Sequence, residues 1–214
     1  MSDRLPSLIV VSGPSGAGKS TILARVLEEM RNLRFSVSHT TRPARPGEVE
    51  GEDYHFIEEP EFQEMLGRDM FLEHAKVHAH RYGTSRTEYE RAEQDGADLL
   101  LDLDVQGAEQ VRHKFTDAVT VFILPPSRRI LERRLRARGQ EEFSLQRRLA
   151  AAAEEMRKYT EYDFSVINDD LARSVETLKA IIRAARARTS RIDVAARAVL
   201  GTFDDPRPDS PKEN

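Results

Sequence analysis

The stretch "VSGPSGAGKST", residues 11–21, places glycines, a lysine and hydroxyl side chains in the spacing G-x-x-x-x-G-K-S. Glycines let the chain turn around an anion, so that backbone N–H groups point inward at phosphate oxygens. Lys19 can then reach the outer phosphoryl oxygens, and the Ser20 hydroxyl can bind Mg²⁺. The pattern predicts a nucleoside triphosphate site made by Gly13, Pro14, Ser15, Gly16, Ala17, Gly18, Lys19, Ser20 and Thr21.

The residues on either side of this loop predict the elements that hold it. Residues 8–11, "LIVV", form a short apolar run suited to a buried strand. Strand, loop and helix in this order are the context that a phosphate-binding loop requires. The apolar side chains that recur at helical spacing after the loop are Ile22, Leu23, Val26, Leu27 and Met30.

Three further apolar runs, residues 98–105, 119–124 and 164–167, also predict buried strands. Helical patterns lie between or after them, and strands that alternate with helices form a parallel sheet covered on both faces. The predicted fold class is therefore α/β, with a P-loop NTPase core whose parallel sheet is flanked by helices.

Two segments depart from this pattern and divide the chain. The first is rich in Thr, Arg, Pro and Gly and predicts an inserted lobe, residues 37–87; the second holds an Arg-crowded helix, Gly139 and an acidic link, and predicts a small mobile lid, residues 128–148. The proline-rich end, residues 201–214, has too few apolar groups to repay ordering, and we expect it to be disordered. The core is left with residues 1–36, 88–127 and 149–200.

The composition excludes several classes of protein. Among 214 residues, 33% are charged and the net charge is -4, so no overall positive field draws the chain to nucleic acid. The absence of cysteine excludes disulfides, thiolate metal sites and a cysteine nucleophile. The N-terminal apolar run is too short for a signal peptide and no segment approaches membrane-spanning length, so we expect a soluble, cytoplasmic protein without a membrane partner.

A second cluster of polar side chains lies in "SVSHTTRPARPGEVEGEDYHF", residues 36–56. It holds Ser38, Arg42, Arg45 and Tyr54, which are two guanidinium groups and two hydroxyls on one short segment. Guanidinium groups grip planar pairs of phosphate oxygens bidentately. Close to a phosphate-binding loop, this group of residues predicts a second phosphate site.

Two other interpretations are weaker. Residues 104–107, "DVQG", fit the Asp-x-x-Gly switch of a GTPase, but no Asn-Lys-x-Asp or Thr-Lys-x-Asp follows to read a guanine at the triphosphate site. Four histidines, His39, His55, His74 and His78, lie near one another in the sequence. Their spacing matches no metal site, and we expect ordinary polar or half-buried histidines.

Taken together, the motifs resemble those of the guanylate kinases. The resemblance runs from Leu8 to about Ile182, through the phosphate-binding loop, "SVSHTTRPARPGEVEGEDYHF", "FLEHAK", "RYGTS", "LLLDLDVQGA", "FILPPS", "RLRARG" and "VINDDL". It implies transfer of the γ-phosphoryl group of ATP to GMP, and to dGMP, with GDP and ADP as products, as a step of purine nucleotide metabolism. It also implies Mg²⁺ as the cofactor.

The resemblance assigns roles to residues on the acceptor side. The GMP phosphate would be held by Ser38, Arg42, Arg45, Tyr54 and Tyr82, and the guanine would be read by Glu73, Thr84 and Asp104. Guanine presents N1–H and N2–H₂ donors on one edge, which a carboxylate can accept as a pair, whereas adenine lacks both. Glu73 therefore predicts a preference for GMP over AMP.

On the donor side, the resemblance places Asn168 near the adenine, Ser20 on Mg²⁺ and Asp102 on a metal-bound water. Arg134 and Arg138 lie four residues apart and share a helix face, which would aim both at the transferring phosphoryl group. The residues predicted to act in catalysis are Lys19, Arg42, Arg134, Arg138 and Arg148.

The sequence departs from the family pattern at two places. His80 and Arg81 replace a polar and aromatic pair that precedes the Tyr-Gly of many relatives, and the link after Gly139 is altered, so that Arg147 competes with Arg148 for the third arginine role. Two other functions stay open: a protein-binding scaffold, since related domains serve as scaffolds, and a kinase for another small acceptor. The sequence does not decide the oligomeric state, and a homo-oligomer stays open.

Overall fold

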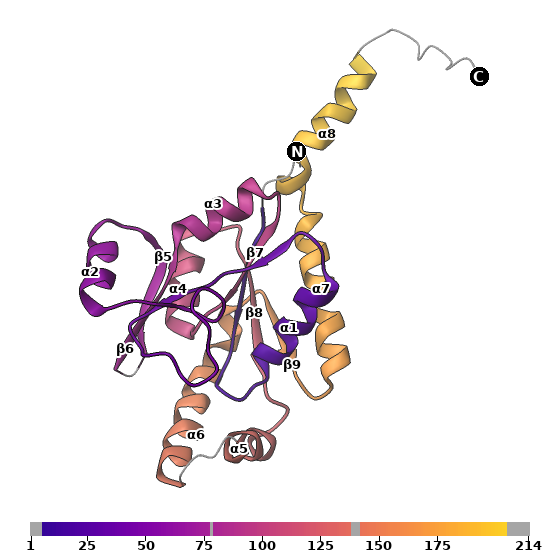
Figure 1. The fold of residues 1–214 in the computed structure, drawn as a ribbon. Helices are drawn as coiled ribbons and strands as arrows, with labels where there is room; N and C mark the ends of the chain where they lie inside the picture. Colours follow the sequence, from indigo (N-terminus) through magenta and orange to yellow (C-terminus); the bar gives the residue numbers. More distant parts are fainter. Residues whose placement is uncertain (1–5, 78, 138–141, 205–214) are drawn as a thin grey trace.

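The computed structural model describes residues 6–77, 79–137 and 142–204. Its centre is a five-stranded sheet in the order β2-β7-β1-β8-β9, in which every neighbouring pair is parallel (Figure 1). The prediction of an α/β fold with a parallel sheet flanked by helices is therefore confirmed. The strands are β1 Leu8–Ser12, β2 Leu33–Phe35, β7 Asp98–Asp102, β8 Val119–Leu124 and β9 Phe164–Ile167.

Helices cover both faces of this sheet because alternate strand residues point to opposite sides. Ile9 and Val11 of β1 face α1 and α7, whereas Leu8 and Val10 face α3 and α4. Strands buried on both faces read as continuous apolar runs, as "LIVV" and "VTVFIL" do. The helices are α1 Lys19–Glu29, α3 Arg86–Gln94, α4 Val105–Lys114 and α7 Leu171–Arg186.

A second, smaller sheet is inserted between β2 and α3, in the order β4-β3-β6-β5. Helix α2, Glu59–Gly67, packs on it through Phe62, whose ring stacks on that of Phe71 with centroids 4.6 Å apart. The division into core, lobe and lid stays a prediction, although the second sheet lies inside the predicted lobe. Its strands are β3 His39–Thr40, β4 His55–Phe56, β5 Phe71–Val77 and β6 His80–Ser85.

Helices α5, Arg128–Arg136, and α6, Glu142–Arg157, follow β8 and are succeeded by a 3₁₀ turn, Lys158–Glu161. Leu131 and Leu135 of α5 pack against Leu145, Leu149 and Ala152 of α6 in a cluster separate from the core of the sheet. The predicted end of the lid at residue 148 falls inside α6, because this apolar repeat continues beyond it.

The described residues after β9 form two helices, α7 and α8. Helix α7 ends at Arg186, and α8, Thr189–Asp204, projects from the body of the molecule (Figure 1). Residues 201–204 are helical, where the sequence analysis expects a disordered tail, and residues 205–214 lie outside the described residues. None of the helices in the described ranges is long and apolar enough to cross a membrane.

The chain passes from the core into the lobe at Val37. The preceding residue, Ser36, donates its N–H to the core strand residue Leu100 at 3.0 Å, and the following residue, Ser38, accepts from the lobe residue His55 at 2.9 Å. Val37 therefore belongs to neither sheet, and its N–H needs another acceptor.

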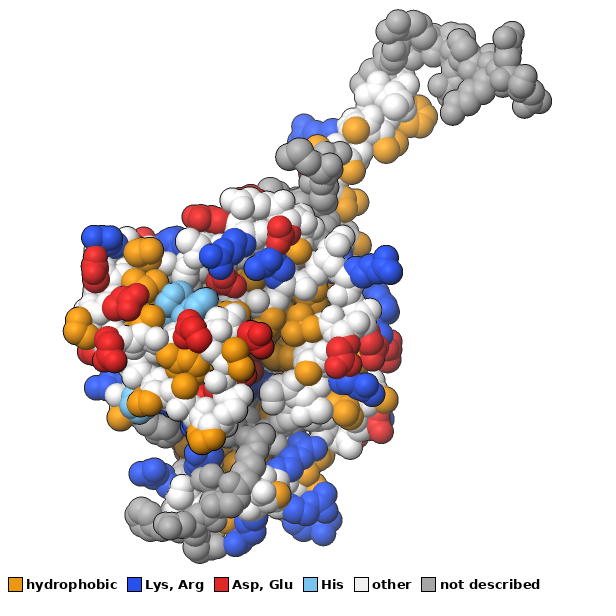
Figure 2. All heavy atoms as spheres, viewed as in Figure 1, with side chains coloured by type: hydrophobic (Ala, Val, Ile, Leu, Met, Phe, Trp, Pro, Cys, Tyr) orange, Lys and Arg blue, Asp and Glu red, His pale blue; other side chains and the backbone are white. Residues whose placement is uncertain are grey.

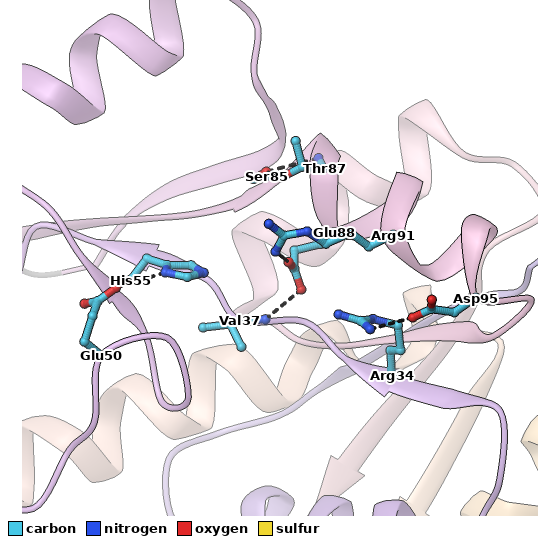
Figure 3. Close-up of polar contacts among 9 residues, drawn as sticks. All are labelled: Arg34, Val37, Glu50, His55, Ser85, Thr87, Glu88, Arg91 and Asp95. Carbon is cyan, nitrogen blue, oxygen red and sulfur yellow. Dashed lines mark hydrogen bonds and ion pairs between the residues drawn. The ribbon is translucent and has the colours of Figure 1, made fainter.

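Glu88 of α3 supplies that acceptor (Figure 3). Its Oε2 accepts from the Val37 N–H at 3.3 Å, and its Oε1 accepts from Arg91 at 3.0 Å. The Glu88 side chain is buried, and α3 is the element through which the chain returns from the lobe to the core. One carboxylate thus ties together the two points at which the chain crosses between the sheets.

Replacing Glu88 by Ala leaves the Val37 N–H without its acceptor in a partly buried place. We expect the free energy of unfolding to fall by about 1–2 kcal/mol, because an unpaired polar group carries its desolvation cost. Urea unfolding of Glu88→Ala and of Glu90→Ala, a change at an exposed position on the same helix, tests this. Equal stability of the two variants would contradict it.

Candidate active site

One cavity of about 400 Å³ lies between the phosphate-binding loop and the inserted lobe. It opens at the carboxyl ends of β1 and β7, the edge at which parallel α/β sheets bind their ligands. The core wall contains Lys19, Asp102 and Asp104, and the lobe wall contains Glu73. The remaining lining residues are Gly13, Pro14, Ser15, Gly16, Gly18, Ser20, Phe35, Ser36, Ser38, Asp53, Tyr54, Ala75, Val77, Tyr82, Leu103 and Glu155.

The phosphate-binding loop has the tight turn that its glycines predict. Gly13, Gly16 and Gly18 have positive φ angles of 140°, 88° and 99°. At Gly13 a Cβ atom would lie 2.3 Å from the carbonyl oxygen of Ile123 on the neighbouring strand, so that a larger residue would push the loop off the sheet. Lys19 folds back over the loop and donates to the Gly13 carbonyl oxygen at 2.7 Å.

Asp102 ends β7 beside this loop. Its Oδ1 lies 3.7 Å from Lys19 Nζ, so the carboxylate predicted to act on the metal side and the lysine predicted to bind phosphate face each other. Burial raises the pKa of Asp102, and the charge of Lys19 opposes that rise. Ser20 is exposed at the start of α1 and lines the same cavity.

The side chains of Arg134 and Asn168 hold the phosphate-binding loop through hydrogen bonds to its backbone. Arg134 donates to the carbonyl oxygens of Ala17 at 2.9 Å and Asn168 at 3.2 Å, and the Asn168 amide donates to Ala17 at 2.8 Å. Neither side chain lines the cavity. Arg148 is half-buried on α6 and Arg147 is exposed, and neither lines the cavity; Arg138 lies outside the described residues.

On the lobe side, hydroxyl groups predicted to bind the second phosphate lie together. Ser38, Tyr54 and Tyr82 line the cavity, and the two tyrosine rings meet edge to face with centroids 5.9 Å apart. The Ser38 hydroxyl lies 3.2 Å from that of Thr84, which is fully buried behind it. Burial is also the main reason that the pKa of Tyr54 is raised.

The two arginines of residues 36–56, Arg42 and Arg45, do not line the cavity. Arg42 is buried and donates from both terminal nitrogens to Glu48, at 2.9 and 2.8 Å, and its guanidinium lies 5.5 Å from the centroid of the Tyr54 ring. Arg45 is exposed and donates its backbone N–H to Glu48 at 2.7 Å. Arg42 therefore lies directly behind a cavity residue, and neither guanidinium lines the cavity.

Glu73 is the most buried carboxylate of the cavity wall, with 3% of its surface exposed. Its Oε1 accepts from the Thr84 N–H at 3.0 Å. Burial raises its pKa to about 7; the Thr84 hydrogen bonds oppose this rise, and the nearby charge of Asp104 adds to it. Near neutral pH this group can accept hydrogen bonds as a carboxylate or donate one as an acid.

Gly107 allows Glu73 to lie against α4. A Cβ atom at residue 107 would lie 2.4 Å from Glu73 Oε2. The first turn of this helix is capped by Asp104, whose Oδ1 accepts from the Gly107 N–H at 2.9 Å. The helix cap Asp104, Gly107 and the carboxylate of Glu73 therefore pack together at one end of the cavity.

Several cavity residues were not singled out by the sequence analysis. Glu155 of α6 is half-buried, and burial raises its pKa while Lys19 opposes that rise. It lies seven residues after Arg148, a helical spacing that could have flagged it, since residues seven apart share a face. Ser36 also lines the cavity, and its buried hydroxyl has no hydrogen-bond partner among the described residues.

His39, His55 and His74 lie on strands of the lobe sheet, within the described ranges. No group of three or more His, Cys, Asp or Glu side chains there could hold a metal ion. The rings of His39 and His55 are tilted by 36° with centroids 4.7 Å apart, and burial together with the charge of His55 lowers the pKa of His39 to about 4. His78 lies outside the described residues.

The fold and the cavity define the class of protein: an α/β nucleotide-binding protein with a P-loop and an inserted lobe facing it. The sequence model of the guanylate kinase family matches residues 6–185. The chain belongs to the guanylate kinase family.

Individual relatives agree with this assignment. The guanylate kinases of Escherichia coli (strain K12) and Salmonella typhi are each 50% identical to it over 188 residues, which cover 86% of this chain and 91% of each relative. The crystal structure of guanylate kinase from Anaplasma phagocytophilum matches with a TM-score of 0.74 and 33% identity, covering 88% of this chain and 90% of the other.

The raised pKa of Glu73 predicts a pH-dependent stability. Between its ordinary pKa of 4.5 and its folded value of about 7, the folded protein binds a proton that the unfolded chain releases, so stability falls as the pH rises through this window. In Glu73→Gln this loss is absent. We expect the stability of the variant relative to the parent to increase by on the order of 3 kcal/mol between pH 4.5 and 8.

Chemical denaturation of both proteins across that pH range measures the difference. Glu52→Gln, a change at an exposed loop carboxylate, is the control and should follow the parent at each pH. A constant difference between Glu73→Gln and the parent would contradict the prediction.

Proposed function

We propose that this protein transfers the γ-phosphoryl group of ATP to GMP, giving ADP and GDP, and that dGMP is also an acceptor. The proposal is carried by one observation: a single cavity joins the phosphate-binding Lys19 on the core to the buried Glu73 on the lobe. A donor nucleotide on the loop and an acceptor base at Glu73 would share that space, with the phosphates between them.

Glu73 would read the guanine. Its carboxylate can accept the N1–H and N2–H₂ donors, with Thr84 and Asp104 completing the base site. With AMP the same carboxylate would face the bare N1 of adenine and remain buried without a donor. Sites that hydrogen-bond a ligand in this way can bind the analogue about 10⁴–10⁵-fold less well.

GMP binding should strengthen as the pH rises from 6 to 8. The N1–H and N2–H₂ donors of guanine need the ionised carboxylate of Glu73, whose pKa is about 7.

The GMP phosphate would be bound by the hydroxyls of Ser38, Tyr54 and Tyr82, with Arg42 and Arg45 supplying positive charge. Arg42 is already oriented by Glu48 and by the Tyr54 ring. To reach the phosphate it must exchange at least one of its bonds to Glu48. The bidentate pair therefore keeps the guanidinium ready near the site without placing an unpaired charge in it.

The donor phosphates would lie against the N–H groups of residues 13–20, with Lys19 on the outer phosphoryl oxygens and Asn168 near the adenine. Ser20 and Asp102, the latter through water, are the donors that fit Mg²⁺, which keeps several waters and binds chiefly to substrate phosphates. When bound, Mg²⁺ supplies charge neutralisation. Arg134, Arg138 and Arg148 are assigned to the transferring group.

The chemistry needs no covalent intermediate with the protein. An oxygen of the GMP phosphate attacks the γ-phosphorus in line, and the bond from that phosphorus to the bridging oxygen of ADP breaks. Lys19 and the arginines neutralise the charge that spreads over the phosphoryl oxygens, and the two walls of the cavity fix the approach of the reactants. A dedicated strong base is not required.

Two other functions are distinguished by the same residues. A protein-binding scaffold does not need a lysine folded over an intact glycine loop, which this chain retains. A kinase for another acceptor does not need a buried carboxylate that faces the base site, as Glu73 does. A cytoplasmic location stays a prediction of the sequence.

The function is tested by measuring ADP release with GMP, dGMP, AMP, UMP and CMP as acceptors. We expect turnover with GMP and dGMP, with AMP slower by at least 10³-fold, because only guanine pairs with Glu73. Lys19→Ala should lower kcat by at least 10²-fold, since it removes transition-state charge stabilisation. Absence of turnover with every acceptor would favour a scaffold, and turnover with a non-guanine acceptor alone would refute the assignment.

We also propose that lobe and lid close over the bound nucleotides, since water is a competing acceptor. Spin labels at Glu61→Cys on α2 and Ala172→Cys on α7, both exposed in a chain that contains no cysteine, report the distance between lobe and core. The distance should shorten when GMP and a non-hydrolysable ATP analogue are both added. An unchanged distance distribution would exclude lobe closure.

A further inference from the structure

Selection of the acceptor base has to come from side chains inside the cavity. Over the face of the lobe and core shown in Figure 2, the described acidic, basic and hydrophobic side chains are mixed, so charge on this face does not sort nucleotides before they enter. Inside, Glu73 is the buried carboxylate of the cavity wall, and Gly107 makes room for it. The contacts that hold Glu73 in place are therefore part of the specificity of the site.

Glu73 follows an irregularity in β5, the edge strand of the lobe sheet. The pairing of β5 with β6 shifts register between Phe71 and Glu73, so Leu72 is an extra residue, as in a β-bulge. Bulges re-aim the side chains beside them. Leu72 packs into an apolar cluster of the large sheet, and Glu73 lines the cavity. The irregularity thus anchors the lobe strand in the core directly before the carboxylate.

Side chains of α4 bond the backbone groups that face outward from this edge strand. The helix lies beside β5 (Figure 1). The Gln110 amide accepts from the His74 N–H at 3.2 Å and donates to the His74 carbonyl oxygen at 2.6 Å, as a neighbouring strand would. Lys114 donates to the Leu72 carbonyl oxygen at 2.9 Å. The backbone is therefore held by the core on both sides of Glu73.

The same helix carries the other carboxylate assigned to the guanine. Asp104 caps its first turn, and residues 104, 107, 110 and 114 are spaced by three, three and four positions, so they lie on one face of α4. Gln110 also reaches the Gln106 carbonyl oxygen of its own helix, but at 3.4 Å, so its bonds to His74 are the shorter ones. How closely this face holds β5 sets the separation of Asp104 and Glu73.

We propose that Gln110 is a positioning residue for the base site: by bonding both backbone groups of His74, it holds Glu73 against α4, where its carboxylate can accept the two guanine donors. This inference rests on the proposed function, because it concerns how that site selects its acceptor. Gln110 does not line the cavity, so it acts through Glu73. Residues that lock a binding group in this way control affinity without touching the ligand.

The kinetic test is Gln110→Met, which keeps the length of the side chain and removes both bonds to His74. We expect the KM for GMP to rise about tenfold, the order expected for the loss of one or two hydrogen bonds, while the KM for ATP stays unchanged. The preference for GMP over AMP should fall by a similar factor, because AMP does not pair with Glu73. Gln94→Met, at an exposed position on α3, is the matched control and should behave as the parent.

A double-mutant cycle separates positioning from a general structural role. If Gln110 acts through Glu73, Gln110→Met should change the KM for GMP little in a Glu73→Gln background. Equal effects in the two backgrounds, or a parent-like KM and GMP preference in Gln110→Met, would overturn the inference. Absence of GMP turnover in the parent itself would instead refute the proposed function.

A measurement without nucleotide tests the positioning even in that case. Burial is the main reason that the pKa of Glu73 is raised to about 7, so a Glu73 released from α4 should titrate closer to its ordinary value of 4.5. The charges of Asp104 and Lys114, which also act on Glu73, are kept in the variant. NMR titration of the ¹³C-labelled carboxylate in the parent, Gln110→Met and Gln94→Met measures the shift. A pKa in Gln110→Met equal to that of the parent would overturn the inference.

Discussion

The parallel pairing of β1 between β7 and β8 is the constraint on which the site depends. Val11 is in register with Asp102 on one side and with Val121 on the other. Hydrogen bonding on both sides fixes where β1 ends, and the phosphate-binding loop starts from that point. Lys19 then returns to within 3.7 Å of Asp102. A shift of register by one residue would reverse the faces of β1 and separate these two groups.

The cavity concentrates carboxylates, and this arrangement costs stability. Burial raises the pKa of Glu73, Asp102 and Glu155, which shows that each of these ionised groups would be better solvated outside the fold. Groups of this kind cluster at sites that bind charged or hydrogen-bonding ligands. The arginines are arranged differently, because Arg42 and Arg134 are bonded to protein oxygens around the edge of the cavity. Positive charge is thus held at the edge of the cavity while each guanidinium stays paired.

Three parts of the molecule have apolar clusters of their own. The sheet has one on each face, the α5–α6 pair has its leucine cluster, and the lobe has the stacked Phe62 and Phe71. The lobe is also joined to the core, because Leu72 of β5 belongs to one of the sheet clusters and Lys114 of α4 donates to its carbonyl oxygen at 2.9 Å. The chain crosses from the core to the lobe through Val37, and there the contact to Glu88 is a side-chain bond instead of a sheet ladder. A displacement there would break few backbone bonds.

The sequence alone determined the local features. Loop glycines at fixed spacing, apolar runs such as residues 119–124, and helical periodicity depend on neighbours in the chain, so the phosphate-binding loop and four of the five strands of the large sheet could be predicted from them. The short strand β2 was not predicted, and the strand predicted at residues 98–105 ends at Asp102, because Asp104 caps α4. Ser38 and Tyr54 were predicted from the polar segment at residues 36–56, and resemblance to a family added Glu73 and Tyr82. The fold brings all four to one cavity. Their joint action in catalysis stays a prediction.

Tertiary structure decided what depends on partners distant in the sequence. That Arg42 pairs with Glu48 and that Arg134 bonds to Ala17 could not be inferred from residue type, because a guanidinium donates to any well-placed oxygen. The burial of Glu73 against Gly107, the tie from Glu88 to Val37 and the position of Glu155 in the cavity likewise arise from packing between elements. The extent of α8 was also missed, because a polar, proline-rich end hides a helix that continues through residue 204. Sequence patterns report on neighbouring residues, whereas burial and pairing are set only when the chain has folded.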